Sequence, residues 1–254
     1  MFVWFFFCIF GLEPLINYNS LIFQARAESP KIQPFTVVID PGHGGDAFGA
    51  VSVTGFKEAD YVLEIAQLLK NQFQNHPNIQ LILTRESDVE VSLRDRAKIA
   101  NDSRANAFIS IHANAATSQK LRGIETYSIN VASDTFSQVV ANRENDTQNI
   151  DINKIQQLNP NTMLLSLELS DLVQNTMIET LQENYPVEAI KNLGHKTALF
   201  SVLVETQMPA VLFEIGFVSN PQEERQMRCL HYKMSIVEGL TKVILEWKER
   251  NSGI

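Results

Sequence analysis

The stretch VVIDPGHGG, residues 37–45, joins a short apolar run to a glycine-rich turn that carries one histidine, His43. The β-branched residues at 36–39 favour a buried strand, and Pro41 with its neighbouring glycines favours a turn at the strand's end. Such a turn can bind phosphate, but the Gly-x-Gly-x-x-Gly and Gly-Lys-Ser/Thr spacings are missing and Pro41 offers no backbone donor. We favour a second interpretation, in which the glycines let the backbone curl so that His43 points at a metal ion.

Strand-like and helical patterns alternate along the chain from Lys31 onward. Helices are expected over 58–73 and 92–101, and short strands over 35–40, 79–84, 107–112, 123–129, 201–205 and 210–215. This alternation predicts an α/β fold: a single domain with a twisted, mostly parallel β-sheet flanked by helices on both faces. In open sheets of this type, sites lie beyond the carboxyl ends of the strands, where His43, His112 and Glu214 are expected.

Residues 132–185 interrupt the alternation and form a helical insertion before the last strands. A polar run, NRENDTQNIDINKIQQLNPN (142–161), precedes a helix whose apolar residues from Leu165 to Ile178 share one face. Two interpretations remain open. The segment is either a core helix preceded by a long loop, or a lid or regulatory insertion at about 142–185.

Composition bounds the class of protein. The chain has 254 residues, 44% of them hydrophobic and 20% charged, as expected of one ordinary globular domain. The formal net charge of −8 argues against a protein that binds the nucleic-acid backbone. We therefore expect no nucleic-acid partner.

The N-terminal segment resembles an export signal. The apolar start MFVWFFFCIF is followed by Ala-Arg-Ala at 25–27, the small-x-small pattern of a signal-peptidase site. A signal peptide at 1–27 would place the mature chain in the periplasm or elsewhere outside the cytoplasm. No Lys or Arg precedes the apolar run, so an uncleaved anchor and a misplaced start are alternatives. Glu13 and Pro14 interrupt the run, so we expect no stable transmembrane domain after cleavage.

Two cysteines, Cys8 and Cys229, are present. Cleavage after residue 27 would leave only Cys229, which excludes an internal disulfide in the mature chain. We expect Cys229 to be a packed helix residue.

Two of the five histidines, His43 and His112, end or closely follow a strand run. A catalytic zinc site uses about three protein ligands and keeps one position open for water. These histidines can supply two ligands, and Glu58, which opens the helix over 58–73, can supply a third. Glu58 is equally consistent with an acidic residue favoured by the helix dipole, and position alone does not decide. The other histidines are expected at the surface, or as packing or capping residues: His76, His195 and His231.

A hydrolytic zinc site also needs a base that accepts a proton from water. Glu214 ends the apolar run 210–213, where a carboxylate is costly to bury unless something positive lies nearby. A carboxylate that reaches solvent at the strand end is the simpler alternative. Neither His-Glu-x-x-His nor Gly-x-Ser-x-Gly occurs, so a helix-borne zinc protease and a nucleophile-elbow hydrolase are excluded.

Several strings together resemble one family, the zinc-dependent N-acetylmuramoyl-L-alanine amidases of the bacterial cell-division type. The strings occur in the family's order across most of residues 35–250: VVIDPGHGG (37–45), GFKEAD (55–60), LTRESD (83–88), SLRDRAKIAN (92–101), FISIHANA (108–115), RGIETYS (122–128) and VLFEIGFVSNPQEE (211–224). Each string alone is weak, but jointly they are specific.

The resemblance implies that His43, Glu58 and His112 bind Zn²⁺ and that Glu214 is the catalytic base. It implies a catalytic domain over 28–254 that cleaves the amide between N-acetylmuramic acid and L-alanine in peptidoglycan, for cell separation or wall remodelling. Asp40 is expected either to orient His43 or only to form the turn.

In relatives of the division type, a helical insertion before the catalytic glutamate blocks the zinc until an activator protein displaces it. Residues 142–185 occupy that place here, so the resemblance implies autoinhibition, with Glu144 and Glu168 as candidates for the blocking carboxylate. A shortened, unblocked insertion is the alternative.

Three other functions were weighed. A metallopeptidase of the same fold would cut within the stem peptide, and a non-enzymatic wall-binding module would have kept the fold without the chemistry. Ser128-Ile129-Asn130 and Lys196-Thr197-Ala198 loosely match two motifs of active-serine penicillin-binding proteins, but no Ser-x-x-Lys occurs.

Overall fold

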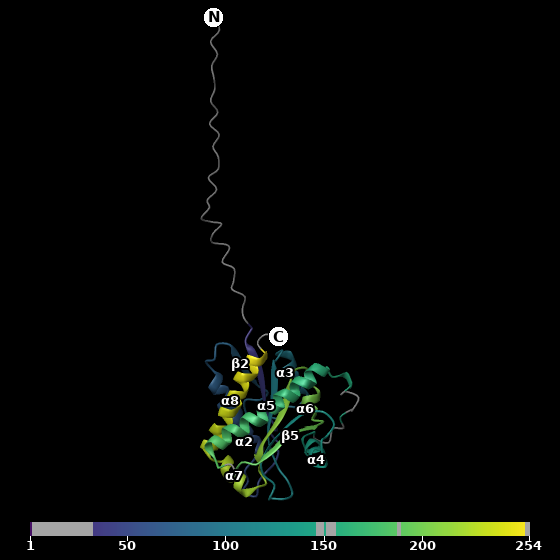
Figure 1. The fold of residues 1–254 in the computed structure, drawn as a ribbon, viewed down its shortest axis with the longest axis vertical. Coiled ribbons are helices and arrows are strands. Elements are labelled where there is room, and N and C mark those ends of the chain that lie inside the picture. Colours follow the sequence, from purple (N-terminus) through teal and green to yellow (C-terminus); the bar gives the residue numbers. More distant parts are fainter. Residues whose placement is uncertain (2–32, 146–149, 151–155, 187–188, 252–254) are drawn as a thin grey trace. The chain divides into compact units, whose positions relative to one another are not determined.

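The computed structural model describes residues 1, 33–145, 150, 156–186 and 189–251 (Figure 1). The chain divides into two units, residues 1–33 and 34–254, and all the elements below belong to the second. Apart from Met1, the expected export signal at 1–27 lies outside the described residues. None of the helices in the described part is both long and apolar enough to cross a membrane.

The described residues form six strands and seven helices. The strands are β1 (Phe35–Pro41), β2 (Ile79–Leu83), β3 (Ala107–Asn114), β4 (Ile124–Ile129), β5 (Asn192–Ala198) and β6 (Ala210–Phe217). The helices are α2 (Glu58–Phe73), α3 (Leu93–Asp102), α4 (Thr135–Glu144), α5 (Pro160–Asn184), α6 (Ser201–Val204), α7 (Pro221–Met227) and α8 (Leu230–Asn251).

One six-stranded sheet has the order β2-β1-β3-β6-β4-β5. All neighbouring strands are parallel except β4 and β6, which are antiparallel. The central strands β1, β3 and β6 are buried along their whole length, which explains their near-continuous apolar sequences. The mostly parallel α/β architecture expected from the sequence is confirmed.

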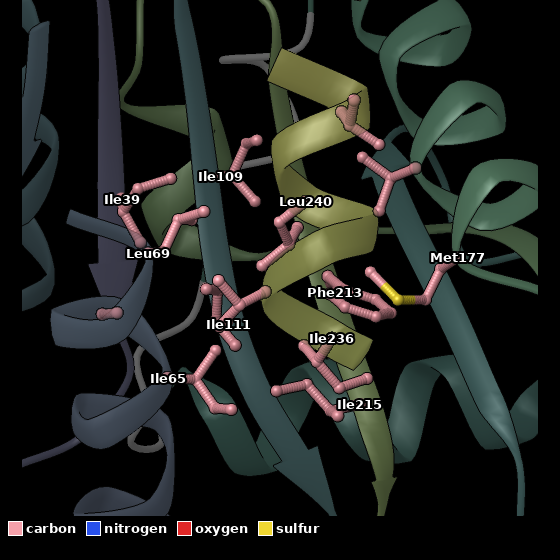
Figure 2. Packing of buried hydrophobic residues seen from close by; sticks show 14 of the residues in the cluster. Ile39, Ile65, Leu69, Ile109, Ile111, Met177, Phe213, Ile215, Ile236 and Leu240 are labelled. Atoms are coloured by element: carbon pink, nitrogen blue, oxygen red, sulfur yellow. The ribbon is translucent and has the colours of Figure 1, made fainter. Parts of the chain in front are cut away.

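Helices cover both faces of the sheet and enclose two hydrophobic clusters. Side chains of α2, α5 and α8 pack on one face; Figure 2 shows Ile65, Met177 and Leu240 from these helices beside buried strand residues. Side chains of α3, α4 and α6 pack on the other face, around Phe108 and Leu212. Alternate residues of each central strand therefore point into different clusters, as strand geometry requires.

Helix α5 is part of the core. Its residues Leu169, Val173, Met177 and Leu181 are fully buried, and the helix packs against β4 and α8. Asn159 caps its first turn by accepting a hydrogen bond from the Asn161 backbone, and Pro160 takes the first helical position. The sequence left two interpretations of the insertion open, and α5 fits the first of them, a helix that packs in the core.

Three expectations from the sequence were wrong. The run 201–205 is no strand; its residues 201–204 form the short buried helix α6, because a run of three apolar residues fits a buried helix as well as a strand. The sixth strand is instead β5, a half-buried polar edge strand without an apolar signal. Cys229 is exposed between α7 and α8 rather than packed inside a helix.

Candidate metal centre

The carboxyl ends of three neighbouring central strands bring the candidate residues together. The turn after β1 carries His43, while β3 carries His112 and β6 carries Glu214. His112 and Glu214 lie directly opposite each other in the β3–β6 pairing. Glu58 is the first residue of α2 and is fully buried. The site therefore lies at the carboxyl end of the central parallel strands.

The turn after β1 holds His43 in a left-handed conformation, with a φ of 57°. Two buried arginines bind the carbonyl oxygens of this turn. Arg96 donates to the carbonyls of Pro41 (2.8 Å) and His43 (2.6 Å), and Arg85 donates to those of Pro41 (2.9 Å) and Gly42 (2.8 Å). These bonds offset the strain of an unfavourable φ at a non-glycine residue.

Gly42 is required by the close approach of His112. A Cβ atom at position 42 would lie 2.4 Å from the His112 ring, closer than any real contact allows. The glycines of the motif thus do more than permit a tight turn, because one of them leaves room for the second imidazole.

Asp40 does not touch the His43 ring. Its carboxylate accepts hydrogen bonds from Thr84 (2.6 Å), Ser110 (2.7 Å) and Arg96 (2.7 Å). Asp40 therefore does not orient the His43 ring by direct contact. Asp40 instead fixes Arg96, which in turn binds the His43 carbonyl.

Four ligand-type atoms converge beside this turn. His43 Nε2 lies 3.2 Å from Glu58 Oε1 and 3.1 Å from Glu144 Oε2, and His112 Nδ1 lies 3.1 Å and 3.2 Å from the same two oxygens. All four atoms lie within 4.8 Å of one another. Glu58 is held in place by the backbone N–H groups of Ala50 and Ala113.

The four distances between imidazole nitrogens and carboxylate oxygens are close to those between the ligands of a bound metal ion. Ligand atoms about 2.0–2.1 Å from a zinc ion lie about 3.3–3.4 Å apart in a tetrahedron. His43 Nε2 and Glu144 Oε2 are buried and have no hydrogen-bond partner by geometry, which a bound cation would explain. Two imidazole nitrogens and two carboxylate oxygens are a donor set that Zn²⁺ accepts.

Electrostatics couples the four side chains. Burial alone would lower the pKa of His43, but Glu58 and Glu144 raise it to about 9. Burial alone would raise the pKa of Glu58, but His43 and His112 lower it to about 2. The same opposition raises the pKa of His112 and lowers that of Glu144. The two carboxylates thus create a place where positive charge is strongly favoured.

Glu214 lies next to this cluster and is fully buried. Neither of its carboxylate oxygens has a hydrogen-bond partner. Burial, together with the carboxylates Glu144 and Glu58, raises its pKa well above the usual range, although His112 and Arg143 oppose this rise. A buried carboxylate without a hydrogen-bond partner is a group free to take a proton.

Arg143 fills the space between Glu214 and the cluster. Its Nε and Nη2 atoms both lie 2.7 Å from Glu144 Oε1, and Nη1 donates to the Ala115 carbonyl (2.7 Å). Nη2 also donates to Asn114 Oδ1 (3.1 Å) and lies 3.8 Å from Glu214 Oε1. The last two residues of α4 therefore occupy both the ligand cluster and the space beside Glu214.

The structure brings together His43, Glu58, His112, Glu214 and Glu144, all of which sequence reasoning names. Glu168, the other candidate for a blocking carboxylate, is exposed on α5 and lines a separate surface pocket with Asp171 and Arg250. Outside the cluster, His195 bonds with Ser128 (2.8 Å) and lies 3.2 Å from Asp171.

Sequence reasoning does not single out Arg143, Asn114 or Arg96. Two signals in the sequence point towards the first two. Arg143 directly precedes Glu144 at the start of a polar run, and Asn114 follows His112 by two residues on one strand. No comparable signal identifies Arg96, whose partners come from a distant turn.

Comparison with known proteins shows the family to which the chain is similar. A family model described as N-acetylmuramoyl-L-alanine amidase matches residues 37–246. The N-acetylmuramoyl-L-alanine amidase AmiA of Escherichia coli strain K12 is 32% identical over 252 residues, which cover 93% of this chain and 86% of AmiA.

Solved structures of N-acetylmuramoyl-L-alanine amidases are also similar to this chain. The crystal structure of an N-acetylmuramoyl-L-alanine amidase from Clostridium difficile 630 matches with a TM-score of 0.68 and 31% identity, covering 86% of this chain and 99% of that one. The amidase AmiC2 of Nostoc punctiforme matches with a TM-score of 0.65 and 27% identity, covering 85% and 97% of the two chains.

Proposed function

The chain belongs to the N-acetylmuramoyl-L-alanine amidase family and hydrolyses the amide bond between N-acetylmuramic acid and L-alanine in peptidoglycan; we propose that it does so at a zinc ion held by His43, Glu58 and His112. In this proposal Glu214 is the catalytic base. The observation that carries it is the convergence of the ligand atoms of His43, Glu58 and His112 beside one buried carboxylate, Glu214, that accepts no hydrogen bond.

Each side chain has a distinct part in the reaction. When bound, Zn²⁺ supplies a Lewis acid that polarises the scissile carbonyl and lowers the pKa of water to about 7. Glu214 accepts the proton of the attacking water and returns it to the leaving nitrogen. Glu58 is held by two backbone N–H groups, so its carboxylate is already oriented before the substrate arrives.

The proposal includes a closed resting state. Glu144 Oε2 lies as close to both imidazole nitrogens as Glu58 Oε1 does, so it takes the fourth ligand position that a hydrolytic site must leave to water. Arg143 occupies the space beside the base. An activator protein that moves the end of α4 would release both groups together.

We further propose that residues 1–27 are an export signal and that 28–254 form the catalytic domain. The support is the apolar start, the Ala-Arg-Ala pattern at 25–27 and the folded unit that begins at residue 34. The enzyme would then work in the periplasm, where its substrate lies, in cell separation or wall remodelling.

Mass spectrometry of digested peptidoglycan tests the reaction and its site together. Purified sacculi are incubated with the Glu144→Ala chain, with and without the further change Glu214→Gln. We expect intact stem peptides with a free L-alanine amine from the first chain and none from the second. Fragments cut within the stem peptide would contradict the amidase and support a metallopeptidase.

Metal content tests the ligands separately from activity. His43→Ala and His112→Ala are each expected to lose most of the zinc that the unchanged chain retains after dialysis, measured by elemental analysis. The exposed His231→Ala serves as the matched control and should retain the metal. Full zinc occupancy in both ligand variants would overturn the assignment.

A further inference from the structure

The guanidinium of Arg143 is bound by a preformed set of hydrogen-bond acceptors. Nη1 donates to the Ala115 carbonyl, Nη2 donates to Asn114 Oδ1, and Nη2 lies 3.8 Å from Glu214 Oε1. Asn114 ends β3, Ala115 follows it, and Glu214 lies on β6, so none of these three groups belongs to α4. They would remain in place when the end of α4 moves away.

The Asn114 side chain is fixed so that its oxygen faces the site. Asn114 is fully buried, and its Nδ2 donates to Glu125 Oε1 (2.7 Å). Glu125 is also fully buried, and its carboxylate accepts from Tyr127 (2.8 Å) and Lys196 (2.7 Å). A carboxylate can only accept from the amide, so Glu125 turns the NH₂ group of Asn114 inward and Oδ1 outward. Oδ1 also accepts from the backbone N–H of Ala115 (2.7 Å), which leaves its second lone pair for a further donor.

The position of Nη2 meets the requirements for the nitrogen of a scissile amide. That nitrogen must lie near Glu214, which returns a proton to it, and its own N–H needs an acceptor that holds it in a fixed orientation. Nη2 lies within hydrogen-bond distance of Asn114 Oδ1 and near Glu214 Oε1. An N–H donor placed there would meet the same acceptor.

We propose that Asn114 Oδ1 and the Ala115 carbonyl bind the N–H donors at the L-alanine end of the stem peptide, and that Arg143 imitates these donors in the resting enzyme. Asn114 is then a catalytic residue that orients the leaving nitrogen, and Glu125 is a positioning residue that orients Asn114. This inference rests on the proposed function.

The step balances in atoms and electrons. The bond between the lactyl carbonyl carbon and the nitrogen breaks, and its electron pair stays with the nitrogen. The carbon keeps the water oxygen as a carboxylic acid, and the nitrogen gains the proton that Glu214 took from the water. Asn114 Oδ1 accepts the original N–H throughout, so the lone pair that forms points towards Glu214.

The test compares variants in the opened chain that carries Arg143→Ala and Glu144→Ala. Adding Asn114→Ala removes the acceptor, and adding Glu125→Gln preserves volume but replaces the charged acceptor of the Asn114 amide with a neutral one. Asn175→Ala, on the exposed face of α5, is the matched control. Melting temperature and zinc content are recorded for each chain.

Two readouts are expected to change. Asn114→Ala should lower kcat on soluble muropeptides by about 10- to 100-fold, with little change in KM or zinc content. It should also weaken calorimetric binding of a stem peptide with a free L-alanine amine to the zinc-free opened chain by about tenfold. The same peptide with hydrogen in place of its amine should bind all of these chains equally. Glu125→Gln should reproduce both effects in part.

The outcomes separate this inference from the proposed function. If the opened chain releases no stem peptide, the proposed function fails; if it does but Asn114→Ala keeps full kcat and peptide binding, only the inference fails. If Asn114→Ala lowers the melting temperature, its loss of activity could reflect a damaged fold, and the Glu125→Gln variant then tests the inference. Reduced peptide binding in that variant supports the inference, and unchanged binding overturns it.

Discussion

At the scale of single residues, the conformation of the His43 turn depends on two arginines that never touch the ring. Arg96 is held by Asp40 and binds the carbonyl of His43, while Arg85 binds the two residues before it. Ligand geometry at this site is therefore set by charged groups buried behind the turn.

Asp40 gives this buried network a dependence on pH. Burial alone would raise its pKa, but Arg96, Thr84 and Ser110 hold it below the ordinary value of 3.8. A carboxyl group with a lowered folded pKa stabilises the fold above its unfolded pKa, and this contribution disappears as the pH falls through the folded pKa.

We therefore expect Asp40→Asn to lower the free energy of unfolding at pH 7 by about 3–5 kcal/mol. The difference from the unchanged chain should shrink below about pH 4. Urea unfolding followed by circular dichroism from pH 2 to pH 7 measures both, with the exposed Asp102→Asn as control. A difference that stays constant across this range would contradict the argument.

Glu214 is the residue whose replacement separates chemistry from metal binding. It is no member of the ligand cluster, so Glu214→Gln should retain zinc while hydrolysis falls by about 10²–10⁴-fold. Activity on sacculi and zinc content are measured in parallel, and the exposed Glu179→Gln is the control. An active Glu214→Gln enzyme would refute the assigned base.

Residue types and spacing predict much of the cluster but not its packing. His43, His112 and Glu214 are candidates because each lies near a strand end, whereas the role of Glu58 and the assignment of the base rest on the family resemblance. Glu144 is one of two candidates, and only the three-dimensional fold distinguishes it from Glu168. The contacts of Asn114 and Arg143 depend on the β3–β6 and β4–β6 pairings, which local sequence does not specify.

At the scale of elements, α4 carries the proposed blocking groups, Arg143 and Glu144, and α5 packs in the core. Only the last turn of α4 reaches the site, whereas α5 lies between β4 and α8. Removing the whole segment 142–185 would take away a core helix, so activation is better tested by single substitutions.

Glu144→Ala should raise activity on sacculi by on the order of tenfold without a partner protein, because the open form no longer competes with a bound carboxylate. Asn142→Ala, on the exposed face of the same helix, should leave the rate unchanged. Initial rates of dye release from labelled sacculi measure both. Equal rates for the two variants would argue against a blocked resting state.

The two faces of α5 predict opposite effects on stability. Leu169 is fully buried and Leu167 is 38% exposed, two residues apart on one helix. Leu169→Ala should lower the free energy of unfolding by about 2–5 kcal/mol, and Leu167→Ala by less than about 0.5 kcal/mol. Denaturant unfolding measures the pair, and similar losses would show that α5 does not pack as described.

Elements with a strong period were predictable and those without one were not. The structure has the predicted helix α2 and the predicted strands β1, β3 and β6. Their apolar patterns were recognisable because these elements are buried along one face or along their whole length. The edge strand β5 has no such signal, since solvent reaches one side of it. The four residues of α6 are too few for the period of a helix to appear.

At the scale of the whole molecule, the proposed export signal at 1–27 can be tested apart from the catalytic domain. Fused to alkaline phosphatase, residues 1–27 should give periplasmic activity in bacteria, and a fusion with Ala25 and Ala27 changed to Leu should not be processed. Cytoplasmic retention of the unchanged fusion would contradict the export signal.

The strand order also governs when a newly made chain becomes able to cut. β6 enters the sheet between β3 and β4, although it is translated last of the six strands. A nascent chain leaving the ribosome already contains both histidines, Glu58 and the α4 residues, but it has no Glu214 and no central strand to hold β3 against β4. A chain that stops before β6 therefore lacks both the proposed base and the strand that joins β3 to β4, and we expect it to be inactive.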